Sequence, residues 1–61
     1  MTRKHFEAVA NAVRLSVLQA DRLHDGASKD TLYVVACDLA ATFSTFNANF
    51  NRTRFLTACG F

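Results

Sequence analysis

Basic side chains are the residues of this sequence best suited to chemistry. Arg3, Lys4 and His5 are consecutive near the start of the chain, and Arg52 and Arg54 stand near its end. Guanidinium and ammonium groups bind phosphates and carboxylates, and arginine does so through paired hydrogen bonds. The five residues therefore form a candidate site for an anion or an acidic partner, provided that the fold brings the two ends of the chain together.

The position of these cations within their helices admits two interpretations. Both basic runs are expected in the first turn of a helix, where the partial positive charge of the N-terminus disfavours cations. One interpretation is an anion site. The other is structural, with the cations facing the negative C-terminal end of the second helix near residues 46–47. Both stay open, because a helix-dipole interaction contributes only about 0.3 to 1 kcal/mol.

The remaining reactive residues do not have the spacing of a catalytic or metal site. His5 and His24 are separated by nearly a whole helix, and the two cysteines, Cys37 and Cys59, lack the close pairing typical of structural zinc sites. We interpret both cysteines as small buried hydrophobic residues rather than as a disulfide, and Cys59 as core rather than as a nucleophile activated by His5. We therefore expect no enzyme activity, no metal and no cofactor.

The elements that must position the basic residues are helices around one apolar stretch, residues 30–46. At the helical period, one stripe of this stretch joins Leu32, Val35, Ala36, Leu39, Phe43 and Phe46, and a milder second stripe joins Tyr33, Cys37, Ala40 and Ser44. Two stripes are wider than a single contact requires. This helix is therefore expected to touch neighbours on two sides.

Three helices are predicted, over residues 2–22, 29–46 and 52–59. In the first, the core stripe is Phe6, Val9, Ala10, Val13, Val17 and Ala20. We expect a capping residue at Thr2, with Met1 and Phe6 as a hydrophobic staple. The turn signal Asp25-Gly26 makes the first two helices antiparallel, with Gly26 supplying any positive φ. Ser28 or Asp30 is expected to cap the second helix.

The short third helix carries signals at both of its ends. Asn51 is the predicted N-cap, and Phe50 and Phe55 are the predicted staple pair. Gly60 is the predicted left-handed stop, after which Phe61 is expected to fold back onto Leu56. An isolated helix this short is unstable. It must therefore dock against the first two helices, which makes residues 1–61 a single, all-α, three-helix domain.

A chain of 61 residues buries too little surface to be very stable on its own. We therefore expect a homo-oligomer formed through the second helix. Leu15 and Leu18 lie outside the core stripe of the first helix, next to the second stripe of the central one. The predicted self-association or partner face consists of Leu15, Leu18, Tyr33, Cys37 and Ala40.

Charge and hydropathy narrow the expected partners. The net charge of +2 is too small to indicate a nucleic-acid-binding protein, and no apolar run approaches the ~20 residues that a membrane span needs. A helix-turn-helix reader also needs polar residues along one face of its recognition helix, and the predicted third helix turns apolar after Arg54. With no apolar signal segment, we expect a cytoplasmic protein.

Both ends of the sequence carry motifs of a known kind. Residues 1–10, MTRKHFEAVA, and residues 46–60, FNANFNRTRFLTACG, resemble a group of very short proteins encoded by bacteriophages and other mobile elements. Those proteins begin with an MTRKHF-type run and end with an FNxxFxRxRFLxACG-type run. The resemblance implies a phage accessory protein acting inside a bacterial host cell. It assigns no site residues, since the group has no established activity.

The resulting hypothesis is a non-enzymatic accessory protein that binds and modulates a host component, such as one of antiviral defence. Two alternatives use the same basic residues. One is a sponge for an anionic small molecule such as a nucleotide signal, and the other is a weak nucleic-acid binder.

Overall fold

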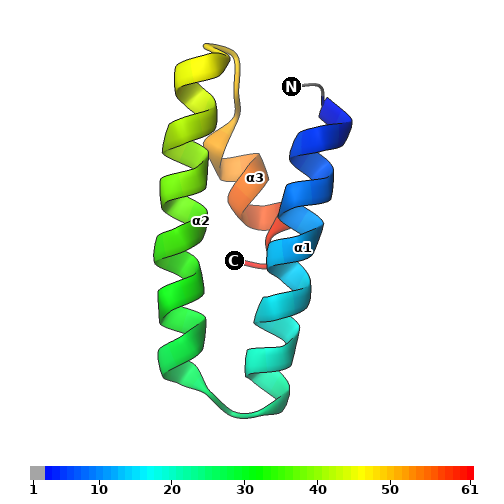
Figure 1. The fold of residues 1–61 in the computed structure, drawn as a ribbon, viewed down its shortest axis with the longest axis vertical. Helices are drawn as coiled ribbons and strands as arrows, with labels where there is room; N and C mark the ends of the chain where they lie inside the picture. The colour runs from blue at the N-terminus through cyan, green and yellow to red at the C-terminus, as the bar shows by residue number, and fades with distance from the viewer. Residues whose placement is uncertain (1–2) are drawn as a thin grey trace.

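The computed structural model describes residues 3–61, and all three predicted helices are present. They are α1 (Arg3–Arg22), α2 (Gly26–Phe46) and α3 (Arg52–Ala58). The two long helices are antiparallel, and α3 packs against both of them, on one side of the pair, near the end that holds the start of α1 and the end of α2 (Figure 1). Each helix contacts the other two, which confirms the prediction that α2 has neighbours on two sides. The predicted cap at Thr2 and its staple with Met1 lie outside the described residues.

The turn between α1 and α2 uses residues other than the predicted ones. His24 N–H donates to the Asp21 carbonyl at 3.1 Å and Asp25 N–H to the Ala20 carbonyl at 2.9 Å, the bonding pattern of a Schellman motif. The left-handed residue of this motif is His24, with φ +53°, and not Gly26. Gly26 is instead the first residue of α2.

Asp25 also caps α2, so the prediction of Ser28 or Asp30 as cap is wrong. The Asp25 side chain accepts a hydrogen bond from Ser28 N–H at 3.0 Å. A capping oxygen reaches an N–H two or three residues further on, and Asp25 stands three residues before Ser28. The helix therefore begins three residues earlier than predicted.

The ends of α3 follow the sequence prediction. Asn51 Oδ1 accepts from Arg54 N–H at 3.0 Å, and Gly60 has φ +99°. Gly60 N–H donates to Thr57 and Phe61 N–H to Leu56, which completes a second Schellman motif. The turn directs the Phe61 ring onto Tyr33 of α2, with the ring centroids 5.1 Å apart.

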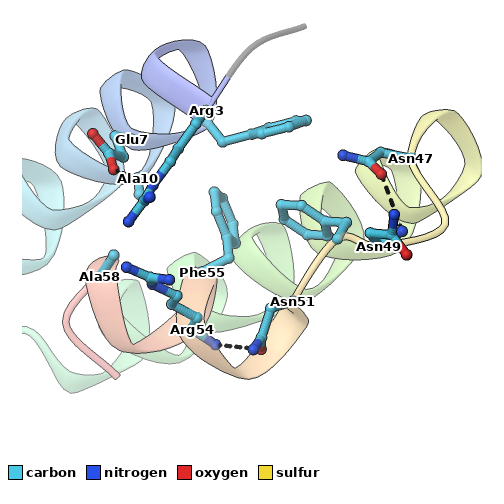
Figure 2. Close-up of a pocket in the computed structure, with 11 residues that line it drawn as sticks. Arg3, Glu7, Ala10, Asn47, Asn49, Asn51, Arg54, Phe55 and Ala58 are labelled. Atoms are coloured by element: carbon cyan, nitrogen blue, oxygen red, sulfur yellow. Dashed lines mark hydrogen bonds and ion pairs between the residues drawn. The ribbon is translucent and has the colours of Figure 1, made fainter.

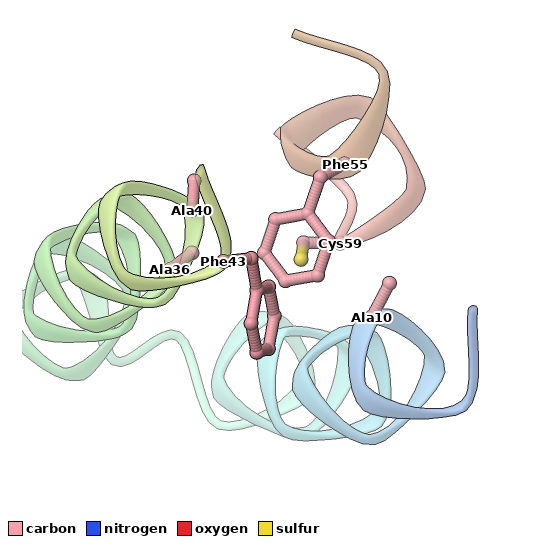
Figure 3. Close-up of a cluster of buried hydrophobic side chains, with 6 residues drawn as sticks. All are labelled: Ala10, Ala36, Ala40, Phe43, Phe55 and Cys59. Carbon is pink, nitrogen blue, oxygen red and sulfur yellow. The ribbon is translucent and has the colours of Figure 1, made fainter. Parts of the chain in front are cut away.

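The core lies where the three helices meet, and most of its residues are small (Figure 3). Phe43 and Phe55 stand edge to face, with centroids 5.4 Å apart. Alanines surround them and allow the helix backbones to approach closely. The buried residues are Ala10, Val17, Ala20, Ala36, Ala40, Phe43, Phe55 and Cys59. The predicted stripe of α1 is confirmed, because its other members, Phe6, Val9 and Val13, pack against this core.

The buried face of α2 is rotated from the predicted stripe toward the second one. Ala40 is buried, whereas Val35 is 43% exposed and Phe46 is 75% exposed. Val35 and Phe46, two members of the predicted apolar stripe, therefore lie outside the core. The rotation arises because α2 packs against α3 as well as α1, which centres its buried arc on Ala36 and Ala40. Within residues 3–61, no helix combines the length and hydropathy of a membrane span.

Candidate binding groove

A groove of about 570 Å³ opens between the start of α1, the α2–α3 connection and α3 (Figure 2). This volume lies in the range of small-molecule sites. The groove is lined by Arg3, Phe6, Glu7, Ala10, Asn47, Asn49, Phe50, Asn51, Arg54, Phe55 and Ala58. It thus joins residues from both ends of the chain.

Aromatic rings form the apolar part of the groove. The Phe6 ring is tilted against those of Phe43 and Phe50, with both centroid distances 4.9 Å, and the Phe50 centroid lies 5.6 Å from that of Phe55. Phe6, Phe50 and Phe55 line the groove, and each packs in or against the core, so their edges toward the groove are held in place. The groove consequently has a rigid apolar floor.

Asparagines of the α2–α3 connection form part of the wall. Asn47 Oδ1 accepts from Asn49 N–H, and Asn51 Oδ1 accepts from Arg54 N–H, both at 3.0 Å. Both bonds fix the local backbone, as side chains of this type do in turns and at helix starts. Asn47 and Asn49 were not predicted as site residues. The available signal was two closely spaced asparagines between Phe46 and Phe50.

Two of the five predicted cations line the groove. They are Arg3 and Arg54, and Figure 2 shows their side chains extending into the space between α1 and α3. Arg3 Nε also donates to Glu7 Oε1 at 3.2 Å, an exposed ion pair within one helix. Such pairs contribute about 0.3–0.5 kcal/mol, so the Arg3 guanidinium is easily redirected to another anion.

The other three predicted cations lie outside the groove lining. Arg52 Nε donates to Ser44 Oγ at 3.0 Å, which ties the start of α3 to α2. Lys4 and His5 are exposed on the first turn of α1. The predicted cluster of five is therefore divided, with Arg3 and Arg54 on the groove and Arg52 in a helix–helix contact.

Two potentially reactive side chains of this region are Glu7 and Cys59. Among the described lining residues, Glu7 is the only acidic one, and its side chain is 64% exposed and paired with Arg3. Cys59 is a free thiol that is completely buried, and burial raises its pKa above the ordinary 9.0, which keeps it neutral. Its place in the core confirms the sequence prediction. Among the described residues, no group of three or more His, Cys, Asp or Glu side chains could hold a metal.

The predicted self-association face requires one correction. Ala40 is 2% exposed and belongs to the core, so it cannot contribute to a surface. Leu15, Leu18 and Tyr33 are exposed, and Cys37 is half-buried. The ring of Phe61 packs against the ring of Tyr33. A hydrogen bond with Cys37 raises the pKa of the Tyr33 phenol. Self-association itself stays a prediction.

Comparison with known proteins found no similar protein. No protein-family model matches the chain, no curated protein matches it, and no solved structure matches its fold.

Proposed function

We propose that this chain is a non-enzymatic accessory protein of a bacteriophage or mobile element, which binds and modulates a component of the bacterial host, such as one of antiviral defence. The observation that carries the binding role is the groove that Arg3 and Arg54 line together. The phage origin and the host setting rest on the resemblance of residues 1–10 and 46–60 to short phage proteins.

The groove combines two features that recognition of an anionic group requires. The guanidinium groups of Arg3 and Arg54 form charge-assisted, paired hydrogen bonds with carboxylates or phosphates. The floor of phenylalanine edges excludes water from one side of any group held there, which strengthens those bonds. An acidic side chain beside an apolar one on a host protein has the matching chemistry.

A second candidate function is a sponge for an anionic small molecule, such as a nucleotide signal. The size of the groove, about 570 Å³, favours this alternative because it is enough for a small ligand. An aromatic floor and an arginine side chain suit a base and a phosphate.

A charge-matched pair of double variants tests the groove. Arg3→Ala/Arg54→Ala removes two cations from the groove, and Lys4→Ala/Arg52→Ala removes two from outside it, so the net charge falls equally. Each untagged protein is expressed in a bacterial host, purified gently and measured by native mass spectrometry. We expect a bound host component on the wild type and the Lys4/Arg52 variant, and its loss from the Arg3/Arg54 variant.

The added mass separates the candidates. A protein-sized addition supports the host-protein partner, and a small anionic addition supports the sponge. Equal loss in both double variants indicates general electrostatic attraction and contradicts a groove-specific site. Binding to any DNA with a steep salt dependence supports the nucleic-acid alternative instead.

A further inference from the structure

The side of the α1–α2 pair opposite α3 is a surface that the groove does not explain. Two α2 residues face α3 and the end of the chain that follows it. Ser44 accepts a hydrogen bond from Arg52 of α3, and the Tyr33 ring contacts the ring of Phe61. Two residues correspond to about 200° around a helix. Val35 is two residues after Tyr33, and Phe46 is two residues after Ser44. Both therefore point away from α3.

The same geometry holds on α1. Arg14 lies next to Gly60 after α3, and Ala10 lines the groove beside α3. Val9 comes directly before Ala10, and Val13 directly before Arg14. Each is therefore rotated about 100° around the helix from a residue that faces α3. The surface opposite α3, called here the open face, consists of His5, Val9, Ala12, Val13, Ser16, Thr31, Leu32, Val35, Leu39, Thr42 and Phe46.

The open face contains no lysine, arginine, aspartate or glutamate. The charged residues of α1 all fall within an arc of about 100° on the other side of that helix. They are Arg3, Lys4, Glu7, Arg14, Asp21 and Arg22. Asp38 lies at the border of the open face on α2. A large uncharged surface on a small protein is typical of an interface.

Apolar side chains on the open face are incompletely covered. Phe46 is 75% exposed and Val35 is 43% exposed, and between them Leu39 is half-buried. The chain exposes 4407 Å², against about 4,000 Å² for a compact monomer of its 6.8 kDa. A partner bound to this face would bury these apolar side chains and reduce the exposed surface of the chain.

The size and the charge of the open face both fit a second copy of this chain. The two longer dimensions of the Cα trace are 36 and 18 Å, so one broad side with its side chains is comparable in area with the ~800 Å² that each partner contributes to a standard interface. A twofold interface brings each patch against itself, and a patch without lysine, arginine, aspartate or glutamate meets little like-charge repulsion there. Permanent homodimer interfaces are also the more apolar class.

We infer that the open face binds the open face of a second copy, so that two α1–α2 pairs form a four-helix bundle with each α3 on the outside. The dimer forms through Val35, Leu39 and Phe46 rather than through Leu15 and Leu18. Leu18 lies within the charged arc of α1 and Leu15 just beside it, so a twofold contact there would bring the cations Arg14 and Arg22 of both copies together. The groove stays open to solvent in this arrangement.

Two double variants with the same charge change test the dimer. Val35→Glu/Phe46→Glu places charges on the open face, and Leu15→Glu/Leu18→Glu places them on other exposed leucines. Sedimentation equilibrium of the wild type is expected to give about twice 6.8 kDa. The Val35/Phe46 variant is expected to raise the dissociation constant at least ~100-fold with its helical circular dichroism retained, and the Leu15/Leu18 variant is expected to stay dimeric.

Dilution of the wild type gives a measurement that does not depend on whether a variant folds. The methyl signals of Val35 and Leu39 are expected to shift on dilution, while those of Leu15 and Leu18 stay constant. A monomeric wild type at ~100 µM overturns the inference. So does a dimer that Leu15→Glu/Leu18→Glu dissociates and Val35→Glu/Phe46→Glu does not. Dimerisation of Arg3→Ala/Arg54→Ala is expected to be unchanged, which separates this inference from the proposed function.

Discussion

Asp25 accepts two hydrogen bonds from Ser28, one from the backbone N–H at 3.0 Å and one from the hydroxyl at 2.6 Å. Both bonds favour the ionised carboxyl group and hold the pKa of Asp25 below its ordinary 3.8, the hydroxyl bond most strongly. Because the same carboxylate caps α2, the two hydrogen bonds link its charge to the start of that helix.

Replacement of this cap is expected to destabilise the protein. Asp25→Ala should lower the midpoint of thermal unfolding by roughly 4–8 °C, because Ser28 N–H loses its partner. Asp30→Ala removes the same charge within α2 and should change the midpoint far less. Thermal circular dichroism of both variants checks this, and equal effects would mean that Asp25 acts only through its charge.

The same carboxylate predicts a dependence on acid. A group whose pKa is lowered by folding contributes stability above its unfolded pKa and loses that contribution as pH falls through its folded pKa. The stability difference between wild type and Asp25→Ala should therefore be full at neutral pH and shrink below about pH 4. Urea denaturation at several pH values measures it, and a constant difference across this range would argue against the ionised cap.

His24 occupies a left-handed conformation, with φ +53°, that costs a side-chain-bearing residue energy. His24→Gly should stabilise the protein by about 0.5–1 kcal/mol, because glycine adopts this conformation without strain. Gln19→Gly, inside α1, should instead destabilise it by about 1 kcal/mol. Denaturant unfolding of both variants should therefore give changes of opposite sign, and two losses would exclude strain at His24.

The two glycines should respond oppositely to a methyl group. Gly60 has φ +99°, and an added Cβ would meet Arg14 and Val17 only at ordinary contact distances of 3.7 and 3.8 Å. Gly60→Ala should therefore cost about 1–2 kcal/mol through backbone conformation alone. Gly26 is helical with open space around it, and Gly26→Ala should gain about 0.4–1 kcal/mol. Unfolding curves compare the two directly, and a loss at Gly26 would contradict the helix start.

Cys59 should make the protein sensitive to alkali. Burial raises the pKa of its thiol above 9.0, so its contribution to stability is present below pH 9 and is lost as the pH rises through the folded pKa. Cys59→Ala is expected to be less stable at neutral pH but to lose less stability between pH 8 and pH 10. Parallel alkaline loss in wild type and variant would point to other groups.

Local signals explain why α3 was predictable in detail. Asn51 and Gly60 act through bonds to backbone groups within a few residues, so their roles follow from adjacent sequence. The turn before α2 is also held by local hydrogen bonds, but its sequence is compatible with two backbone conformations. Asp25-Gly26 suggests a glycine turn, and only the folded chain shows His24 taking the left-handed position.

Contacts between helices explain what the sequence did not reveal. α2 carries two neighbouring apolar stripes, and the position of α3 decides that Ala40 is buried while Phe46 is exposed. Antiparallel topology correctly predicted that Arg3 and Arg54 come together, but not that Arg52 turns toward Ser44. The asparagines of the groove depend on the path of a loop, which periodicity does not describe.

The turn at Asp25 also fixes the rotational phase between the two long helices. One residue both completes the end of α1 and caps the start of α2, so the connection contains no slack. A single inserted residue that preserved either helix would rotate the other by about 100° and carry its alanines away from the core. Evolution or design can thus vary this hairpin by substitution far more readily than by insertion.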